Sequence, residues 1–241
     1  MLKLIHADLY KVFHRIFFYC LLAVMAVLAV LVNFSLSRLS TSISAYSSWM
    51  VVRLYFLSWP IFIMPILVDL IAAEEYKEHT LKNAVSYGLN RTTLYGSQLI
   101  ASIILGVIVG VVALGFYCGS SLLFLKSDPQ FTGEFIADFF SRVGISCIGY
   151  VAAITIAAFF AMIFQKNSLF VFAFYAAIFL PQGLLELLGH SEWNQYLLIT
   201  QFGQIASGTT QQMMESSVIF VITAAFFVIL GIIFFQKKDI R

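Results

Sequence analysis

The sequence predicts an all-α membrane protein that crosses the bilayer several times, and three observations lead to this fold class. Of the 241 residues, 61% are hydrophobic and only 11% are charged, whereas charged residues make up about 25% of a typical soluble domain. Phenylalanine occurs 25 times, which is more apolar bulk than a soluble core of this size needs. The apolar residues also gather in long runs, so lipid is the solvent expected for most of the surface.

Six of these runs are long enough to cross the bilayer, since a transmembrane helix needs about 20 mostly apolar residues. They extend over residues 16–33, 54–73, 97–123, 143–164, 168–188 and 217–235. Pro60, Pro65 and Pro181 fall in the second and fifth runs, where kinks are tolerated if neighbouring helices bind the freed carbonyls. The prediction is one transmembrane domain over residues 1–241 with six transmembrane helices.

Residues 1–15 precede the first run and predict a short amphipathic helix. One helical face carries the apolar side chains Leu2, Ile5, Leu9, Val12 and Phe13, and the basic residues lie elsewhere. This pattern suits a helix that lies in the membrane interface. Because Asp8 interrupts the basic leader and no convincing A-x-A site follows, the first run is expected to be kept as a transmembrane helix rather than cleaved as a signal peptide.

The distribution of basic residues predicts the orientation. An N-terminus in the cytosol gives ten basic residues on the cytosolic side and four outside, and cytosolic loops of membrane proteins are enriched in lysine and arginine. The cytosolic residues are Lys3, Lys11, Arg15, Lys77, Lys82, Arg91, Lys166, Lys237, Lys238 and Arg241. The outside residues are Arg38, Arg53, Lys126 and Arg142. With six transmembrane helices, the C-terminus also returns to the cytosol.

The stretch EEYKEHTLKNAVSYGLNR, residues 74–91, is the long polar run of the chain and falls on the predicted cytosolic side. Written as a helix, it places Leu81, Ala84 and Val85 on one side and pairs Glu78 with Lys82 in the favourable i,i+4 order. A short apolar ridge within a charged surface suits a small protein contact. A solvated loop without a partner is the alternative, and it needs no such ridge.

The sequence gives less support for an enzymatic function than for a non-catalytic one. A P-loop is not predicted, because the chain contains no Gly-Lys dipeptide, so any ATP used by this protein is expected on another polypeptide. Glu74 and Glu75 are similar to the EExxxR motif of intramembrane CAAX-type proteases, but His79 stands where that motif has arginine. A protease using Glu74 and Glu75 is therefore the alternative function, and a non-catalytic protein without metal or cofactor is preferred.

Other ionisable and thiol groups add little to a catalytic reading. Within the predicted transmembrane helices the ionisable candidates for function are Asp69 and Glu186, both near helix ends. The three cysteines lie in apolar runs without CxxC spacing, which indicates neither a disulfide framework nor a zinc site. Nothing in the composition indicates binding to nucleic acid.

Residues 75–83, EYKEHTLKN, followed by Ser86 and by GLNR at 88–91, resemble the E-x-x-x-G-T-L-K-N…G-x-[ST]-R pattern of ABC-2 type permeases. These permeases are the membrane subunits of ATP-binding-cassette exporters, also called type V exporters. The resemblance extends over the chain in layout: an N-terminal interfacial helix, six transmembrane helices, a charged loop after the second and a long outer segment after the fifth. His79 departs from the pattern, since many members carry glycine there.

The resemblance implies that residues 74–91 form a cytosolic coupling segment that docks on a separate ATPase subunit, which holds the ATP and Mg²⁺. The docking residues so implied are Glu74, Glu75, Lys77, Glu78, Thr80, Leu81, Lys82 and Asn83. It further implies two ATPase subunits, a second permease that is identical or homologous, and an outer half-helix segment at 182–214. The expected setting is a bacterial plasma membrane, with export of a peptide, antibiotic or lipid-like substrate.

Overall fold

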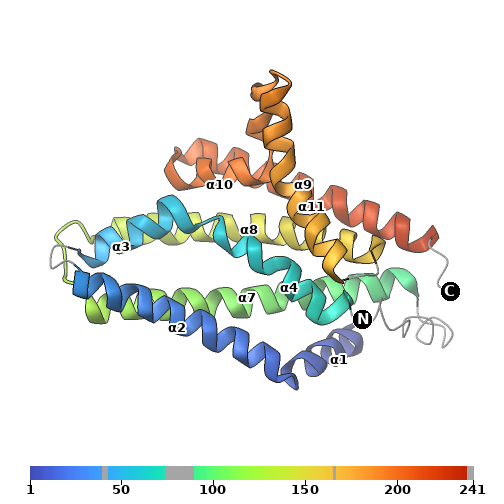
Figure 1. Ribbon diagram of the computed structural model, residues 1–241, viewed down its shortest axis with the longest axis horizontal. Coiled ribbons are helices and arrows are strands. Elements are labelled where there is room, and N and C mark those ends of the chain that lie inside the picture. Colours follow the sequence, from blue (N-terminus) through green and yellow to red (C-terminus); the bar gives the residue numbers. More distant parts are fainter. Residues whose placement is uncertain (40–42, 74–89, 165–166, 238–241) are drawn as a thin grey trace.

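The computed structural model describes residues 1–39, 43–73, 90–164 and 167–237, and this part of the chain consists of helices and short connecting loops without a β-strand (Figure 1). An isolated bridge between Ser44 and Lys126 joins two loops at one end. The helices and short helical turns are α1 (Leu2–Phe13), α2 (Ile16–Leu39), α3 (Ala45–Val51), η1 (Val52–Phe56), η2 (Trp59–Ile63), α4 (Met64–Val68), η3 (Asp69–Ala73), α7 (Arg91–Phe124), α8 (Gly133–Ile163), α9 (Asn167–Leu187), η4 (Ser191–Tyr196), α10 (Leu198–Ser207) and α11 (Thr210–Lys237).

Five of these helices are long and apolar enough to cross a membrane, and a sixth crossing results if one bent pair is counted as a single transmembrane helix. The five are α2, α7, α8, α9 and α11, and the bent pair extends over Ala45–Phe56 and Trp59–Ile71. Each predicted run overlaps one of these five helices or the bent pair. Met1 and the end of α11 lie at the same end of the molecule (Figure 1). Ala73 and Asn90, the described residues on either side of residues 74–89, lie at this end too. We call this the termini end.

The helices pack in two layers along the long axis of the molecule. In one layer α2 packs along α7, and in the other α8 packs along α11. Short side chains allow the close approach in the second layer, where Ala153, Ala157 and Ala161 of α8 are fully buried. Helix α9 leaves the layers obliquely (Figure 1), and no residue of α9 after Ile178 is buried.

The bent pair, Ala45–Phe56 and Trp59–Ile71, has an angle of 58° between its two parts. Pro60 lies in the 3₁₀ turn η2 and Pro65 in α4, and each removes a backbone N–H from the helical ladder. Tyrosine hydroxyls bind carbonyls near the break: Tyr150 Oη donates to Leu57 O at 2.6 Å, and Tyr175 Oη donates to Phe62 O at 2.8 Å. Side chains of α8 and α9 therefore bind backbone carbonyls close to the break.

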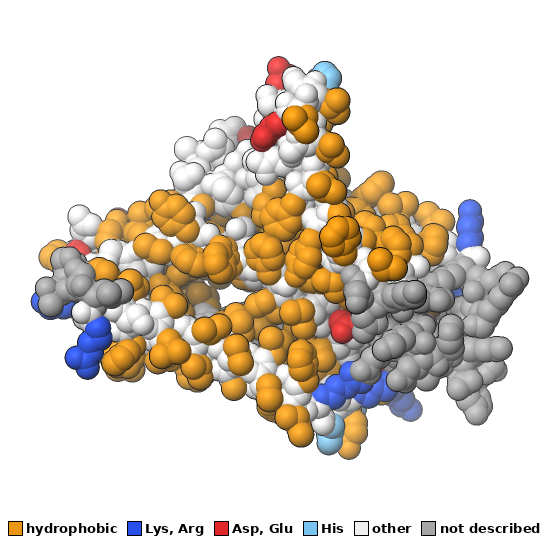
Figure 2. Space-filling model, viewed as in Figure 1, with side chains coloured by type: hydrophobic (Ala, Val, Ile, Leu, Met, Phe, Trp, Pro, Cys, Tyr) orange, Lys and Arg blue, Asp and Glu red, His pale blue; other side chains and the backbone are white. Residues whose placement is uncertain are grey.

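The side surface of the bundle is hydrophobic, while lysine and arginine side chains gather towards its two ends (Figure 2). Large apolar side chains are exposed along the long helices, for example Val111 at 66% on α7 and Ile222 at 63% on α11. In water such a surface would be unstable, because it presents contiguous apolar area far beyond that of soluble monomers. The structure is that of a membrane-embedded helical protein.

Several helices extend beyond the predicted apolar runs, and polar residues explain the difference at two of these ends. The first predicted run ends at Asn33, but α2 continues to Leu39. Asn33 is completely buried and forms hydrogen bonds to α7. The second was begun after Arg53, but the helix begins at Ala45, where Ser44 forms a capping box with Ser47. Asn33 and Arg53 are both hydrogen-bonded by the protein itself, so neither residue ends its helix.

Candidate functional site

The predicted docking residues, Glu74, Glu75, Lys77, Glu78, Thr80, Leu81, Lys82 and Asn83, lie outside the described residues, and so does His79. The structure does describe the two elements that flank them. The chain enters the segment from η3, whose residues Leu70 and Ile71 are buried, and leaves it at Asn90, the N-cap of α7. Asn90 Oδ1 accepts a hydrogen bond from the Thr92 amide at 3.1 Å. Both flanks lie at the termini end of the bundle (Figure 1).

Both flanks are tied to neighbouring helices by arginine. Arg15, at the turn between α1 and α2, reaches the Leu70 carbonyl of η3 with a nitrogen–oxygen distance of 3.5 Å. Arg91, the first residue of α7, donates to the Phe235 and Gln236 carbonyls of α11 at 3.5 and 3.2 Å. A cation at a helix C-terminus binds the free carbonyls and the negative end of the helix dipole. These contacts join α1, η3, α7 and α11 into one platform around the charged segment.

A second polar site lies on the opposite half of the bundle and is formed by Arg53, Asp138 and Arg142, which we call the arginine cluster. Arg53 Nη1 is 2.7 Å from Asp138 Oδ2, and Arg142 Nε is 3.0 Å from each oxygen of the same carboxylate. The side chains of Arg142 and Arg53 are only 7% and 17% exposed, while Asp138 is 37% exposed. Two arginines thus share one carboxylate, which leaves a net positive charge at the cluster.

That positive charge is turned towards the C-terminus of α10. Arg53 Nε donates to the Ala206 carbonyl at 3.0 Å. Arg142 Nη1 donates to the Gly208 carbonyl at 3.1 Å and also to the Ile205 carbonyl. Carbonyls in the last turn of a helix lack helical partners and carry the negative end of its dipole, so both arginines complement α10. The cluster therefore fastens α10 to η1 and α8.

Helix α10 is the short amphipathic helix of the predicted outer segment 182–214. It buries Leu198, Phe202 and Ile205 against α8 and α11. Gly208 separates it from α11, and a Cβ at that position would come within 2.3 Å of the Gln204 carbonyl. The first residues of the predicted segment belong to α9, which extends to Leu187.

A third polar group, centred on Asn33, binds α2 and α3 to α7. Asn33 Nδ2 donates to Ser120 Oγ and to the Tyr117 carbonyl, both at 2.9 Å. Ser48 Oγ donates to Asn33 Oδ1 at 2.8 Å, and its distance to Tyr117 Oη is 2.6 Å. Nearby, Trp49 Nε1 donates to Ser121 Oγ at 2.7 Å. Because these groups satisfy one another, they act as a structural joint and leave little capacity for a ligand.

An apolar groove of about 430 Å³ lies between α2 and α7. Its lining is almost free of polar groups and consists of Val30, Val111, Val112, Gly115, Phe116, Gly119, Ser120, Leu123 and Phe124. Neither Gly115 nor Gly119 has a heavy atom within 4 Å of an added Cβ, so these glycines face open space. The groove offers apolar contacts and no group for acid–base chemistry.

The residues weighed for catalysis are not brought together in the described part of the chain. His6 lies on α1 and His14 is its C-cap residue, whereas His190 follows the far end of α9. In that part no group of three or more His, Cys, Asp or Glu side chains could hold a metal ion. Glu186 of α9 accepts hydrogen bonds from Gln182 and Asn194. Glu74 and Glu75 lie outside the described residues.

Sequence reasoning missed the arginine cluster, since it assigned Arg53 and Arg142 to segments outside the membrane. In the structure both residues lie in helices, Arg53 in η1 of the bent pair and Arg142 in α8. Two signals pointed to the site. Asp138 and Arg142 are spaced i,i+4 on one helix face, and Arg53 interrupts the apolar run WMVVRLYFL.

Comparison with known proteins adds no family assignment, because the chain matches no family model and no curated protein.

Proposed function

We propose that this chain is the permease subunit of an ATP-binding-cassette exporter, driven by two separate ATPase subunits that dock on residues 74–83. The observation that carries the proposal is the course of the bent helix. It leads from Arg53, which holds α10 at one end of the bundle, to η3, which enters the charged segment at the termini end. One continuous stretch of chain thus links the predicted docking surface to a short helix on the opposite half.

The termini end has the properties that a docking surface for a motor protein needs. The flanks of the segment are anchored through Arg15 on η3 and Arg91 on α11, so a displacement of the segment would be transmitted to the bundle. A loop tethered only by flexible chain would absorb the same displacement. The motif resemblance and the ten-to-four bias of basic residues place this end in the cytosol in our proposal.

The opposite half has a candidate for the moving part. Helix α10 is too short to cross the bilayer, and the arginine cluster binds its C-terminal carbonyls from two separate elements, η1 and α8. If ATP binding shifts η1 relative to α8, these hydrogen bonds cannot all persist, and α10 would change position. Such a discrete change between two packed arrangements is what alternating access requires.

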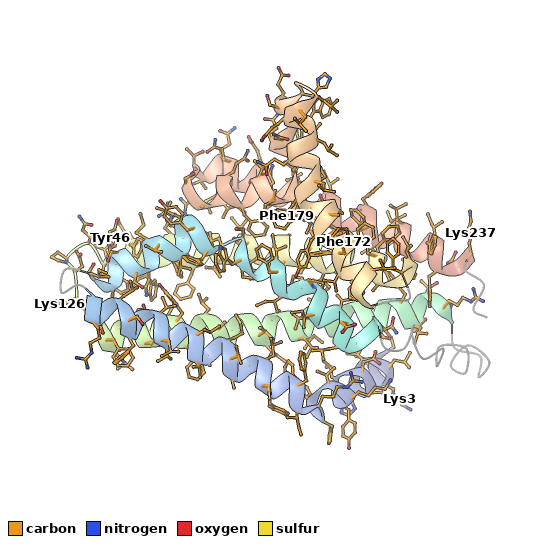
Figure 3. All side chains as sticks on the ribbon, in the orientation of Figure 1. Lys3, Tyr46, Lys126, Phe172, Phe179 and Lys237 are labelled. Atoms are coloured by element: carbon orange, nitrogen blue, oxygen red, sulfur yellow. The ribbon has the colours of Figure 1, made fainter. Side chains whose placement is uncertain are left out.

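The substrate class follows from the apolar character of the surfaces. The groove between α2 and α7 and the exposed side of α9 offer apolar and aromatic contacts, including Phe172 at 73% exposure (Figure 3). We therefore propose a hydrophobic or amphipathic cargo, such as a peptide antibiotic or a lipid-like compound. A second permease, identical or homologous, would complete the pathway in a bacterial plasma membrane.

The test uses a thiol reporter on the far side of the bundle. Ser207, the last residue of α10, is exposed, and Ser207→Cys is introduced after replacement of the three native cysteines by serine. In membranes from the native host, addition of ATP and Mg²⁺ should change the labelling rate of this thiol. The change should disappear when Glu75→Lys and Glu78→Lys reverse the charge of the docking segment.

A matched charge reversal at Lys126→Glu, on the opposite end of the molecule (Figure 3), should leave the response to ATP intact. A labelling rate that does not respond to ATP in the parent protein would contradict the proposal. So would an unchanged response in the Glu75→Lys, Glu78→Lys variant.

A further inference from the structure

Helix α1 has two faces of different chemistry, and the structure shows which of them packs on the bundle. The apolar stripe predicted to face lipid packs on the bundle instead: Val12 is fully buried, and Ile5, Leu9 and Phe13 pack against the hydrophobic core. Leu2 is the exception, with 83% exposure. The contacts of α1 are with α2, α7 and η3.

The outward face of α1 carries basic and aromatic side chains. Lys3, His6, Tyr10, Lys11 and His14 are all exposed, and their spacing places them on one side of the helix. Figure 2 shows lysine, arginine and histidine side chains gathered on this side of the molecule, and Figure 3 shows Lys3 there. The helix has one acidic residue, Asp8, which is 7% exposed. The two lysines of α1, Lys3 and Lys11, outnumber this carboxylate, so the helix carries a net positive charge.

His14 and Tyr10 form a defined donor pair on this face. The His14 Nδ1 atom lies 2.8 Å from the Tyr10 carbonyl oxygen. A carbonyl oxygen only accepts hydrogen bonds, so Nδ1 carries a proton and Nε2 is left exposed. The two rings also lie together, with centroids 3.9 Å apart. When both ring nitrogens are protonated, His14 can therefore donate a second hydrogen bond through Nε2.

The outward face must lie close to the membrane surface, because α1 ends at Phe13 and the transmembrane helix α2 begins at Ile16. At the start of α2 the side chains of Ile16, Phe17 and Tyr19 are 81%, 57% and 53% exposed, which places lipid beside them. Tyrosine is enriched at the level of lipid headgroups, and basic side chains near the surface attract anionic lipids.

From this charge complementarity and this position, we infer that the outward face of α1, with Lys3, His6, Tyr10 and His14, binds the phosphate groups of anionic phospholipids. Lysine and imidazolium donate to phosphate oxygens, and the tyrosine hydroxyl adds a neutral donor. The apolar stripe holds the helix on the bundle, so the lipid headgroup is bound by the protein surface and not by insertion of α1. The inference concerns a lipid site and does not depend on an ATPase partner.

The test places a fluorophore on the same face. Ala7 is exposed between Lys3 and His14, so Ala7→Cys is labelled in the full chain after the native cysteines are replaced by serine. The labelled protein, in neutral detergent at pH 6, is titrated with brominated phosphatidylglycerol or brominated phosphatidylcholine as quencher. Phosphatidylglycerol should quench at a lower concentration than phosphatidylcholine. Lys3→Gln with His14→Gln should raise its half-quenching concentration about fivefold or more, since each basic residue near an anionic surface contributes about a factor of five.

The matched control changes the same two residue types elsewhere, with Lys126→Gln and His190→Gln, and should leave the titration unchanged. Native mass spectrometry of the chain with its cysteines intact gives a second readout, in which phosphatidylglycerol is retained by the wild type and lost by the Lys3→Gln, His14→Gln variant. Equal quenching by the two lipids would overturn the inference, and it is the result expected if this face binds a cytosolic protein and no anionic lipid. So would equal titrations of the variant and its control.

Discussion

Replacement of Arg142 by methionine should loosen α10 from the bundle. Methionine keeps much of the apolar stem but removes the guanidinium that binds Asp138 and the carbonyls of Ile205 and Gly208. Asp138 remains partly solvated and keeps Arg53 at 2.7 Å, so the carboxylate is not left alone. The main loss is at the carbonyls, where a hydrogen bond to a charged donor contributes about 1.5–3 kcal/mol.

With two carbonyl hydrogen bonds lost, the expected loss of stability for Arg142→Met is about 3–6 kcal/mol, similar to the loss of about 3–5 kcal/mol for a buried ion pair that loses one partner. Thermal unfolding of the purified protein in one detergent measures it. The matched control is Arg38→Met, since Arg38 is exposed and lies over the Phe34 ring with 5.2 Å to the ring centroid. That control should unfold as the wild type does.

A local readout separates release of α10 from general destabilisation. Ala206 is 4% exposed, so a thiol introduced by Ala206→Cys in the cysteine-free protein should react slowly while α10 is held. Arg142→Met should accelerate its labelling well below the unfolding temperature. If Arg142→Met unfolds with the Arg38→Met control and leaves the thiol protected, the arginine cluster does not hold α10.

Two further substitutions test the packing, each against a control on the same helix and by the same thermal assay. In α8, Gly149→Ala would place a Cβ 2.6 Å from Phe202 Cζ, so we expect a loss of about 1–3 kcal/mol; Gly144→Ala, with open space around it, should be neutral or stabilising. Equal stability of these two variants would show that the contact is not tight. In α2, Asn33→Leu leaves buried partners unpaired and should lower the stability by about 1–3 kcal/mol. Ser35→Leu, on the exposed face of the same helix, should leave the stability unchanged. If Asn33→Leu is as stable as Ser35→Leu, Asn33 does not form a structural joint.

The sequence predicted the transmembrane helices well because lipid leaves a simple signal, a long apolar run. It failed where the protein itself satisfies a polar group. Asn33 and Arg53 look like the ends of helices when each residue is scored alone, yet the first is bound to α7 and the second to Asp138 and α10. No local pattern reveals a partner more than eighty residues away, so these boundaries depend on tertiary structure.

The candidate sites differ in the same way. The charge and the motif of the docking segment are recognisable in the sequence, but its residues 74–83 lie outside the part of the chain that the structure describes. The arginine cluster is the reverse case, because its geometry is clear and its sequence signal is weak. Asp138 and Arg142 are recognisable as a helix pair, but their link to Arg53 and to the carbonyls of α10 depends on the packing of three elements. Likewise, amphipathicity predicted helix α1 but could not decide which face meets the protein.

The central claim is that residues 74–83 dock an ATPase, and the most direct measurement is the ATP hydrolysis that copurifies with this chain from its native host. The account predicts hydrolysis with the wild-type chain, its loss with Glu75→Lys and Glu78→Lys, and its retention with Lys126→Glu, while all three proteins elute as folded species. If no ATP hydrolysis accompanies the wild-type chain, or if the Glu75→Lys, Glu78→Lys variant retains all of it, the proposed function is contradicted.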